Sequence, residues 1–156
     1  RATIVTVWVP LTRATIENGC LMVVPRSHRS GLHQHCRTKL GTAIPDRFVA
    51  EEDAIPLPMR PGSALILTQR TVHSSTDNTT DHEVRISMDL RYQPVGQPTG
   101  RPAFAPAGFV ARSRARPETV LADPAVWAKR WHDVRTQLAS KSPVFNRWQA
   151  GAPGCA

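Results

Sequence analysis

This sequence of 156 residues lacks the features that mark several common protein classes. No apolar run approaches the roughly 18–20 residues that a membrane-spanning helix requires. A nucleophile elbow, a phosphate-binding glycine loop and a zinc-ligand pair are also absent. We therefore expect no membrane partner. We also expect that any catalytic or binding site is built from residues outside these three motifs.

Cysteine is scarce and odd in number. The three cysteines, Cys20, Cys36 and Cys155, show no CxxC spacing. This argues against a disulfide framework or a structural zinc site, so we expect a reducing, cytoplasmic compartment. A reactive thiol is the alternative, although nothing in the surrounding sequence marks a nucleophile.

Positive charge is in excess, with a formal net charge of +8. It crowds the C-terminal third, and no aromatic side chains alternate with it as a stacking platform for nucleic acid would require. We expect a solvated basic face. The alternative is a nucleic-acid-binding module with steeply salt-dependent binding. The basic residues are Arg101, Arg112, Arg114, Arg116, Lys129, Arg130, Arg135, Lys141 and Arg147.

The first stretch of the chain is typical of a β-strand. Residues 3–11 alternate, so that valines fall on one face and Ile4, Thr6 and Trp8 on the other. We expect the valine face to pack against a partner sheet. The opposite face then turns the Thr6 hydroxyl and the Trp8 indole toward a more polar region.

Three further strands are expected, at residues 20–24, 64–67 and 84–92. Residues 26–60, with scattered glycines and prolines, are expected to form a long irregular surface excursion. The strand at 64–67 runs toward His73, and a polar loop at 74–83 follows.

Beyond Gln93 the chain becomes rich in proline and glycine. Asp123 and Pro124 predict a helix start, because aspartate caps a helix and proline suits its first position. Apolar residues then recur at helical spacing, at Trp127, Trp131, Val134 and Leu138. We expect a mostly β domain at residues 1–93, with an extension and amphipathic helix at 94–156 packed on it.

Arg85, Ser87, Asp89 and Arg91 share one face of the strand expected at 84–92. A buried arginine is costly unless it pairs with an anion. The guanidinium of Arg85 and the hydroxyl of Ser87 could bind one carboxylate together. The alternative is an exposed edge-strand arginine helped by Asp89.

Several histidines are candidate metal ligands. His73 lies twelve residues before Arg85 and is either a ligand or a structural residue at a strand end. His33 and His35 form either a metal pair or part of a polar surface loop. For His28, next to a strand end, a hydrogen bond within a turn is expected.

Three sequence blocks fall in order within residues 3–93. They are Val7-Trp8-Val9-Pro10-Leu11 with Glu17-Asn18-Gly19-Cys20-Leu21 and Pro25-Arg26-Ser27-His28, then Pro61-Gly62-Ser63-Ala64 leading to His73 and Asn78, then residues 85–93. Together they resemble the phytanoyl-CoA dioxygenase family of iron(II)- and 2-oxoglutarate-dependent oxygenases. The resemblance implies a double-stranded β-helix, a jelly-roll barrel. Its mouth holds Fe(II) by two histidines and one carboxylate, beside 2-oxoglutarate.

The resemblance also implies roles for individual residues. His73 corresponds to the distal histidine ligand of the metal, and Arg85 to the residue that binds the far carboxylate of 2-oxoglutarate. Ser87 and Ser75 are candidate helpers for the co-substrate. Trp8 and Thr6 are expected to line the pocket.

Two departures from the family pattern stand out. Arg26 replaces the usual glycine of Pro-Gly-Ser-His, which costs about 1 kcal/mol if that backbone needs positive φ. The His-x-Asp pair that precedes the Val-Trp-x-x-Leu strand in the family is absent, and the downstream pair of His33 and His35 cannot replace it. Because the chain also opens on Arg1 next to an apolar strand, we expect the C-terminal part of a longer protein, with a barrel incomplete at its N-terminus.

In full-length context the resemblance implies a monomeric dioxygenase that hydroxylates an aliphatic carbon of a small molecule. The isolated chain is expected to bind iron weakly or not at all and to be inactive. Two alternatives remain: a halogenase of the same fold, and a non-catalytic jelly-roll domain that only binds a ligand.

Overall fold

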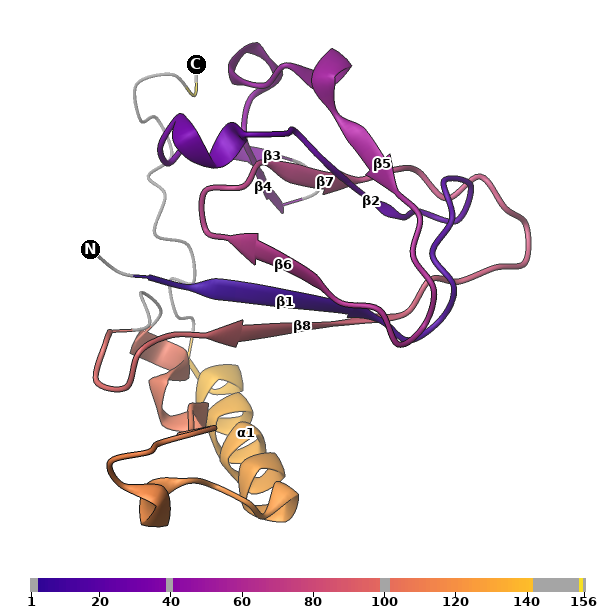
Figure 1. The fold of residues 1–156 in the computed structure, drawn as a ribbon. Helices are drawn as coiled ribbons and strands as arrows, with labels where there is room; N and C mark the ends of the chain where they lie inside the picture. The colour runs from indigo at the N-terminus through magenta and orange to yellow at the C-terminus, as the bar shows by residue number, and fades with distance from the viewer. Residues whose placement is uncertain (1–2, 39–40, 99–101, 142–154, 156) are drawn as a thin grey trace. The chain divides into compact units, whose positions relative to one another are not determined.

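The computed structural model describes residues 3–38, 41–98, 102–141 and 155 (Figure 1). It forms two compact units. The first holds residues 3–94 and Cys155, and the second holds the described residues between 95 and 141.

The first unit is built from short antiparallel strands. Its sheets have the strand orders β6–β1–β8, β5–β2–β7 and β3–β4. The strands are β1 (Val5–Pro10), β2 (Leu21–Val23), β3 (Cys36–Thr38), β4 (Gly41–Ala43), β5 (Ile55–Leu57), β6 (Leu65–Thr68), β7 (His73–Ser75) and β8 (Ser87–Tyr92). The predicted mostly β class is confirmed. The described strands form separate sheets without showing a closed barrel, so the barrel stays a prediction.

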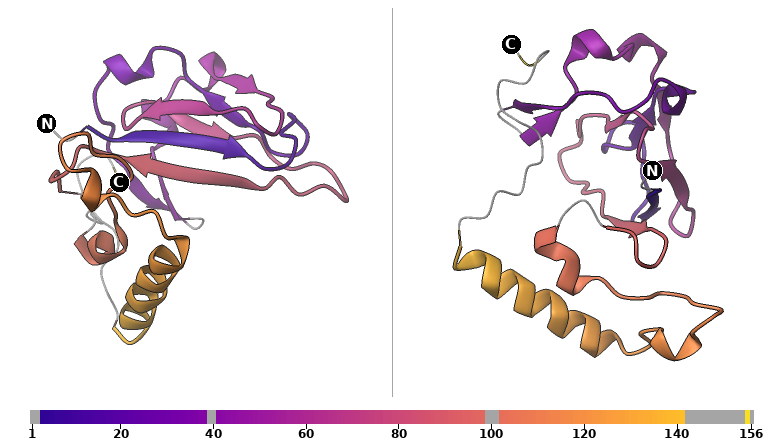
Figure 2. Two further views of the ribbon diagram at one scale, coloured as in Figure 1. Left: turned by 60° about the horizontal axis from the view of Figure 1, so that its bottom comes forward. Right: turned by 90° about the vertical axis from the view of Figure 1, so that its left-hand side faces the viewer.

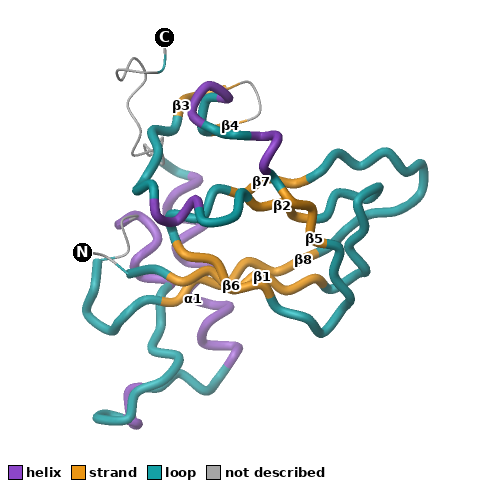
Figure 3. The backbone as a smooth tube through the Cα atoms, turned by 45° about the horizontal axis from the view of Figure 1, so that its top comes forward, coloured by secondary structure: helices purple, strands orange, loops and turns teal. Residues whose placement is uncertain are grey.

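The two three-stranded sheets of the first unit lie across from each other (Figure 3). In β1, Trp8 pairs with Leu65 of β6 and Asp89 of β8, and it is only 4% exposed. It belongs to the buried cluster of the unit, together with Ala14, Cys20 and Leu21. The valines of β1, which we expected to form the packed face, are only half-buried. That expectation was wrong, because the Trp8 face is the one that lies between the sheets.

The segment that carries His73 also differs from the prediction. β6 ends at Thr68, where the backbone N–H of Thr71 donates to the Thr68 carbonyl (3.1 Å) and closes a turn. The two threonine hydroxyls lie 3.1 Å apart and reinforce that turn. His73 therefore does not close the third strand but opens β7, which pairs with β2 through His73 and Val23.

Residues 26–60, expected to be irregular, contain β3, β4 and β5 together with three short 3-10 helices. These helices are η1 (Ser27–Arg29), η2 (Asp46–Phe48) and η3 (Glu51–Asp53). β5 pairs with β2 despite Pro56 in its centre, and each of the three strands has three residues. Strands this short, one of them containing proline, give almost no alternating pattern.

Cys36 forms a disulfide with Cys155, 119 residues away, and Cys20 is a buried free thiol. The pairing corrects the expectation that the cysteines carry no disulfide. It also removes the ground on which a reducing compartment was predicted, because disulfides persist in oxidising environments.

The second unit contains η4 (Pro102–Ala107), η5 (Pro117–Thr119) and α1 (Pro124–Ala139). The Asp123 carboxylate accepts a hydrogen bond from the backbone N–H of Ala125 (2.8 Å), which confirms the predicted helix start. Figure 2 shows η4 beside α1. Two aromatic pairs join α1 to the segment before it: Phe104 with Trp131 and Phe109 with Trp127. No described helix combines the length and apolar character needed to cross a bilayer.

Candidate functional site

A cavity of about 480 Å³ in the first unit brings most of the predicted site residues together. It lies between the inner faces of the β6–β1–β8 and β5–β2–β7 sheets. Its lining residues are Trp8, Leu21, Leu67, His73, Ser74, Ser75, Arg85, Ser87 and Asp89. Thr6, the sixth predicted residue, is not among them; it pairs with Leu67 and Arg91 one pleat farther along β1.

His73 is oriented by the turn that precedes it. Its Nδ1 lies 2.8 Å from the carbonyl oxygen of Thr71. A carbonyl can only accept, so Nδ1 carries a proton, and in the neutral ring the lone pair is on Nε2. A neutral imidazole with one nitrogen fixed by a backbone carbonyl is the arrangement typical of a histidine metal ligand.

Arg85 is held by neutral oxygens on three sides. Its Nη1 donates to Ser87 Oγ (2.7 Å), Nη2 donates to Ser75 Oγ (3.3 Å) and Nε donates to the Gly19 carbonyl (2.5 Å). The guanidinium also lies over the ring of Trp8, 5.4 Å from its centroid. Three predicted residues, Ser75, Ser87 and Trp8, therefore surround the positive charge of a fourth, Arg85.

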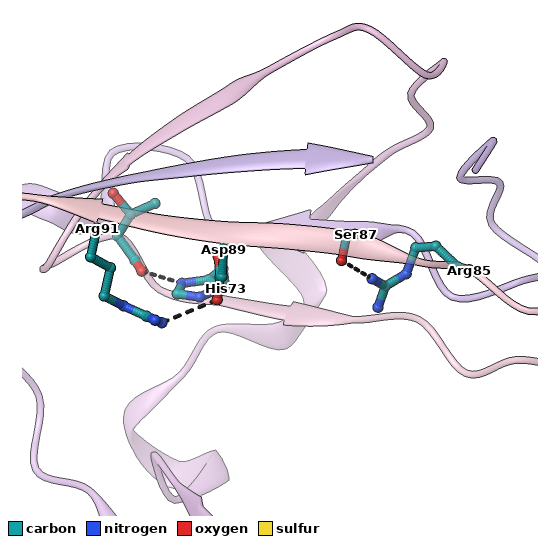
Figure 4. A network of polar contacts seen from close by, with 6 residues as sticks. His73, Arg85, Ser87, Asp89 and Arg91 are labelled. Carbon is teal, nitrogen blue, oxygen red and sulfur yellow. Dashed lines mark hydrogen bonds and ion pairs between the residues drawn. The ribbon is translucent and has the colours of Figure 1, made fainter. Parts of the chain in front are cut away.

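Asp89 does not neutralise that charge. Its carboxylate accepts from Nη2 of Arg91 (3.1 Å), the next residue on the same face of β8. Figure 4 shows Arg85 beside Ser87 at the start of β8, and His73, Asp89 and Arg91 gathered farther along the strand. Within the described part of the chain no carboxylate pairs with Arg85. The interpretation of an edge arginine helped by Asp89 does not fit, and the guanidinium can accept an anionic ligand.

The other histidines lie away from this cavity. Nε2 of His33 is 3.0 Å from Ser30 Oγ, and Nδ1 of His35 bonds the His33 carbonyl (2.9 Å). His28 lies in η1. Over the described residues, no three or more His, Cys, Asp or Glu side chains gather as a metal site would require. His73 is thus the one predicted ligand that lies in the cavity.

The sequence did not identify Leu21, Leu67 and Ser74 as lining residues, and it also missed the roles of Asp89 and Gly19. Asp89 was placed on the correct face but was not proposed as a lining residue. Gly19 was noted only as a turn residue, and a hydrogen bond from its backbone carbonyl to a side chain 66 residues away leaves no side-chain signal.

Arg26 shows the backbone conformation that its substitution for glycine put in question. It has φ 64° and ψ 0° in the left-handed region. For a residue with a Cβ this conformation costs about 1–2 kcal/mol, offset in part by the larger entropy that glycine loses on folding.

Arg26→Gly should therefore raise the free energy of unfolding by about 0.5–1 kcal/mol in chemical denaturation. Arg26→Ala is the control, because it removes the side chain and keeps the strain. If alanine stabilises as much as glycine, the arginine side chain and not its φ is the source of the effect.

Comparison with known proteins adds independent information. The profile of the family described as phytanoyl-CoA dioxygenase (PhyH) matches residues 1–87. The chain is 32% identical over 111 residues to 1-deoxypentalenic acid 11-beta-hydroxylase of Streptomyces arenae, a match covering 65% of this chain and 39% of that protein. It is 37% identical over 82 residues to phytanoyl-CoA dioxygenase domain-containing protein 1 of Danio rerio, covering 48% and 28%. The chain thus spans well under half the length of these curated relatives.

Solved structures show the same likeness. EvdO2 from Micromonospora carbonacea var. aurantiaca, crystallised with 2-oxoglutarate, matches with a TM-score of 0.50 and 27% identity, over 64% of this chain and 43% of that chain. ThoJ, a non-heme monooxygenase in its apo form, matches with a TM-score of 0.57 over 88% of this chain and 52% of its own. At 22% identity the ThoJ match shows the fold alone.

Proposed function

Because this chain belongs to the phytanoyl-CoA dioxygenase family, whose members use Fe(II) and 2-oxoglutarate, we propose that it is the C-terminal part of such a dioxygenase. The full-length enzyme hydroxylates an aliphatic carbon of a small molecule. The observation that carries the proposal is Arg85, a guanidinium in a cavity wall that neutral oxygens hold in place and no described carboxylate neutralises.

The co-substrate fits the residues around Arg85. One carboxylate of 2-oxoglutarate takes the guanidinium as its ion partner and the hydroxyls of Ser87 and Ser75 as further donors. The Trp8 ring, 4% exposed, walls this end of the cavity and keeps water from one face of the guanidinium. A charge-assisted pair gains strength where water is excluded.

The metal fits His73 through Nε2, the ring nitrogen that the Thr71 carbonyl does not contact. When bound, the iron supplies the oxidising chemistry: oxygen and 2-oxoglutarate are converted to succinate and carbon dioxide, and one oxygen atom enters the substrate C–H bond. The carbonyl of Thr71 keeps the imidazole in the tautomer that binding needs. We propose that the two other protein ligands lie in the longer protein, upstream of residue 1.

Iron-dependent release of succinate tests this proposal. The full-length protein should release succinate from 2-oxoglutarate only with Fe(II) and oxygen, whereas the 156-residue chain, with one ligand, should bind iron weakly or not at all and release none. Succinate release by the 156-residue chain would contradict the ligand assignment, and no release by the full-length protein would contradict the function.

A ligand-binding domain without catalysis is the second candidate, and the lack of a three-ligand cluster over the described residues favours it. Such a domain binds 2-oxoglutarate but releases no succinate in any length of the protein. A halogenase of the same fold releases succinate and is distinguished by the mass of its product.

We further propose a monomer in the cytoplasm, with no nucleic-acid or membrane partner. A reducing cytoplasm would keep Cys36 and Cys155 as thiols, although the structure pairs them. Rapid alkylation of intact cells should then label both cysteines. A disulfide-linked peptide recovered from such cells would contradict the cytoplasmic location.

A further inference from the structure

Arg85 lies just outside regular secondary structure. β8 begins at Ser87, so residues 84–86 lack the strand ladder that was expected to hold them. An arginine on an unsupported segment would lose much of its conformational freedom on binding a ligand, and that loss weakens affinity. The contacts that replace the ladder therefore determine how well Arg85 is prepared for its ligand.

Thr12 holds the backbone on both sides of Arg85. Its hydroxyl accepts from the N–H of Ile86 (2.9 Å) and lies 3.3 Å from the carbonyl of Val84, to which it donates. The N–H groups of Leu11 and Thr12 both donate to the carbonyl of Ile86. Leu11 and Thr12, which follow β1, thus fix the residues that flank Arg85.

Asn18 fixes the chain two residues before Arg85. Asn18 is 5% exposed, and it is the one polar residue that is buried among those the structure describes. Its Nδ2 donates to the carboxylate of Glu83 and to the carbonyl of Arg13, both at 3.0 Å, while Oδ1 accepts from the N–H of Thr15 (2.8 Å). A buried amide with its bonds satisfied is a rigid anchor.

Gly19 holds the guanidinium itself. Its carbonyl accepts a hydrogen bond from Nε of Arg85. The two terminal nitrogens, Nη1 and Nη2, then form the edge of the guanidinium that faces Ser75, Ser87 and the cavity. Gly19 has φ +91°, and an added Cβ would lie 3.3 Å from the Thr76 carbonyl and 4.0 Å from Arg85 Nε. Glycine is therefore required both by the backbone and by the close approach of residue 76.

We propose that Thr12, Asn18 and Gly19 are positioning residues for 2-oxoglutarate, acting through Arg85. By occupying Nε, Gly19 turns the Nη1–Nη2 edge toward the cavity, where a carboxylate can bind both nitrogens at once. Thr12 and Asn18 hold the backbone on either side of Arg85, so that its guanidinium stays within reach of the cavity. The proposal rests on the proposed function of Arg85 as the co-substrate anchor.

Two glycine variants of the full-length, Fe(II)-loaded protein test the proposal by anaerobic calorimetric titration with 2-oxoglutarate. Gly19→Ala should raise the dissociation constant about tenfold or more, the cost of misaligning one charged hydrogen bond. Gly31→Ala is the matched control: its φ is +96° but nothing lies within 4 Å of the added Cβ. It shares the backbone strain and should leave the dissociation constant within about twofold.

Three threonine variants distinguish a positioning role from a general loss of folding. Thr12→Val removes the hydroxyl and should raise the KM for 2-oxoglutarate several-fold, with little change in the KM for the primary substrate. Thr12→Ser should restore it. Thr38→Val, which removes a 3.3 Å hydroxyl bond to the Gly41 carbonyl away from the cavity, should leave both constants unchanged.

The outcomes separate the two proposals. If the unaltered protein binds no 2-oxoglutarate, the proposed function fails. If it binds, but Gly19→Ala matches Gly31→Ala and Thr12→Val matches Thr38→Val, the function stands and the positioning role is overturned. Equal rises in both KM values for Thr12→Val would also overturn it, because they would indicate general loss of structure.

Discussion

Arg85→Ala in the full-length protein should weaken 2-oxoglutarate binding by about 2–5 kcal/mol, the usual cost of removing one partner of a hydrogen-bonded charge pair. At about 1.4 kcal/mol for each factor of ten, the dissociation constant rises roughly 30- to 4000-fold. Alanine removes the positive charge and three donors, and it leaves the hydroxyls of Ser75 and Ser87 without the cation between them. Calorimetric titration under anaerobic conditions measures the change.

Arg85→Lys should lie between the parent protein and alanine. Lysine keeps the charge but lacks the planar fork that bonds Gly19 and the two serines together. Arg91→Ala is the matched control, because Arg91 lies on the same face of β8, is 63% exposed and bonds Asp89. An effect of Arg91→Ala as large as that of Arg85→Ala would show that general positive charge, and not this site, attracts the co-substrate.

His73→Ala should abolish iron-dependent turnover. It removes the one predicted ligand that lies in the cavity, so the loss of iron affinity should exceed the roughly 10–100-fold that outer-shell changes cost. His73 is exposed and its ring makes one hydrogen bond, to the Thr71 carbonyl. Thermal unfolding of the metal-free protein should therefore change little, while bound iron measured after gel filtration falls.

His33→Ala is the control for His73→Ala. His33 bonds Ser30 in a loop away from the cavity, and its removal should leave iron content and succinate release unchanged. Retention of iron and turnover by His73→Ala would show that the metal is bound by other residues.

The alternation of side chains between the two faces of a strand was enough to predict that some residues of the site lie together. It placed Arg85 and Ser87 on one face, and the structure joins them by a 2.7 Å hydrogen bond. It also placed Thr6 with Trp8, but only Trp8 lines the cavity. Alternation defines a face, whereas the depth at which the opposite sheet crosses that face decides which of its residues line a cavity.

Local signals misplaced the strand that carries His73. The strand expected at residues 64–67 runs toward His73, and a separate strand beginning at His73 was not expected. The turn between Thr68 and Thr71, stabilised by two threonine hydroxyls, ends β6 and lets β7 pair with β2. This turn contains no glycine or proline, the residues from which a turn is most readily predicted.

Contacts between residues far apart in the sequence could not be predicted. The carbonyl of Gly19 reaches Arg85 across 66 residues, and Cys36 meets Cys155 across 119. Neither has a periodic pattern, because tertiary folding alone brings the partners together. The pairing of β5 with β2 could not be predicted either, because a three-residue strand centred on Pro56 has the sequence pattern of a loop.

A crystal structure of the full-length protein with 2-oxoglutarate tests the central claim most directly. One carboxylate of the co-substrate should lie within hydrogen-bonding distance of the Arg85 guanidinium and Ser87 Oγ, with the metal on Nε2 of His73. A co-substrate bound elsewhere, with Arg85 still held only by Gly19, Ser75 and Ser87, would contradict the account.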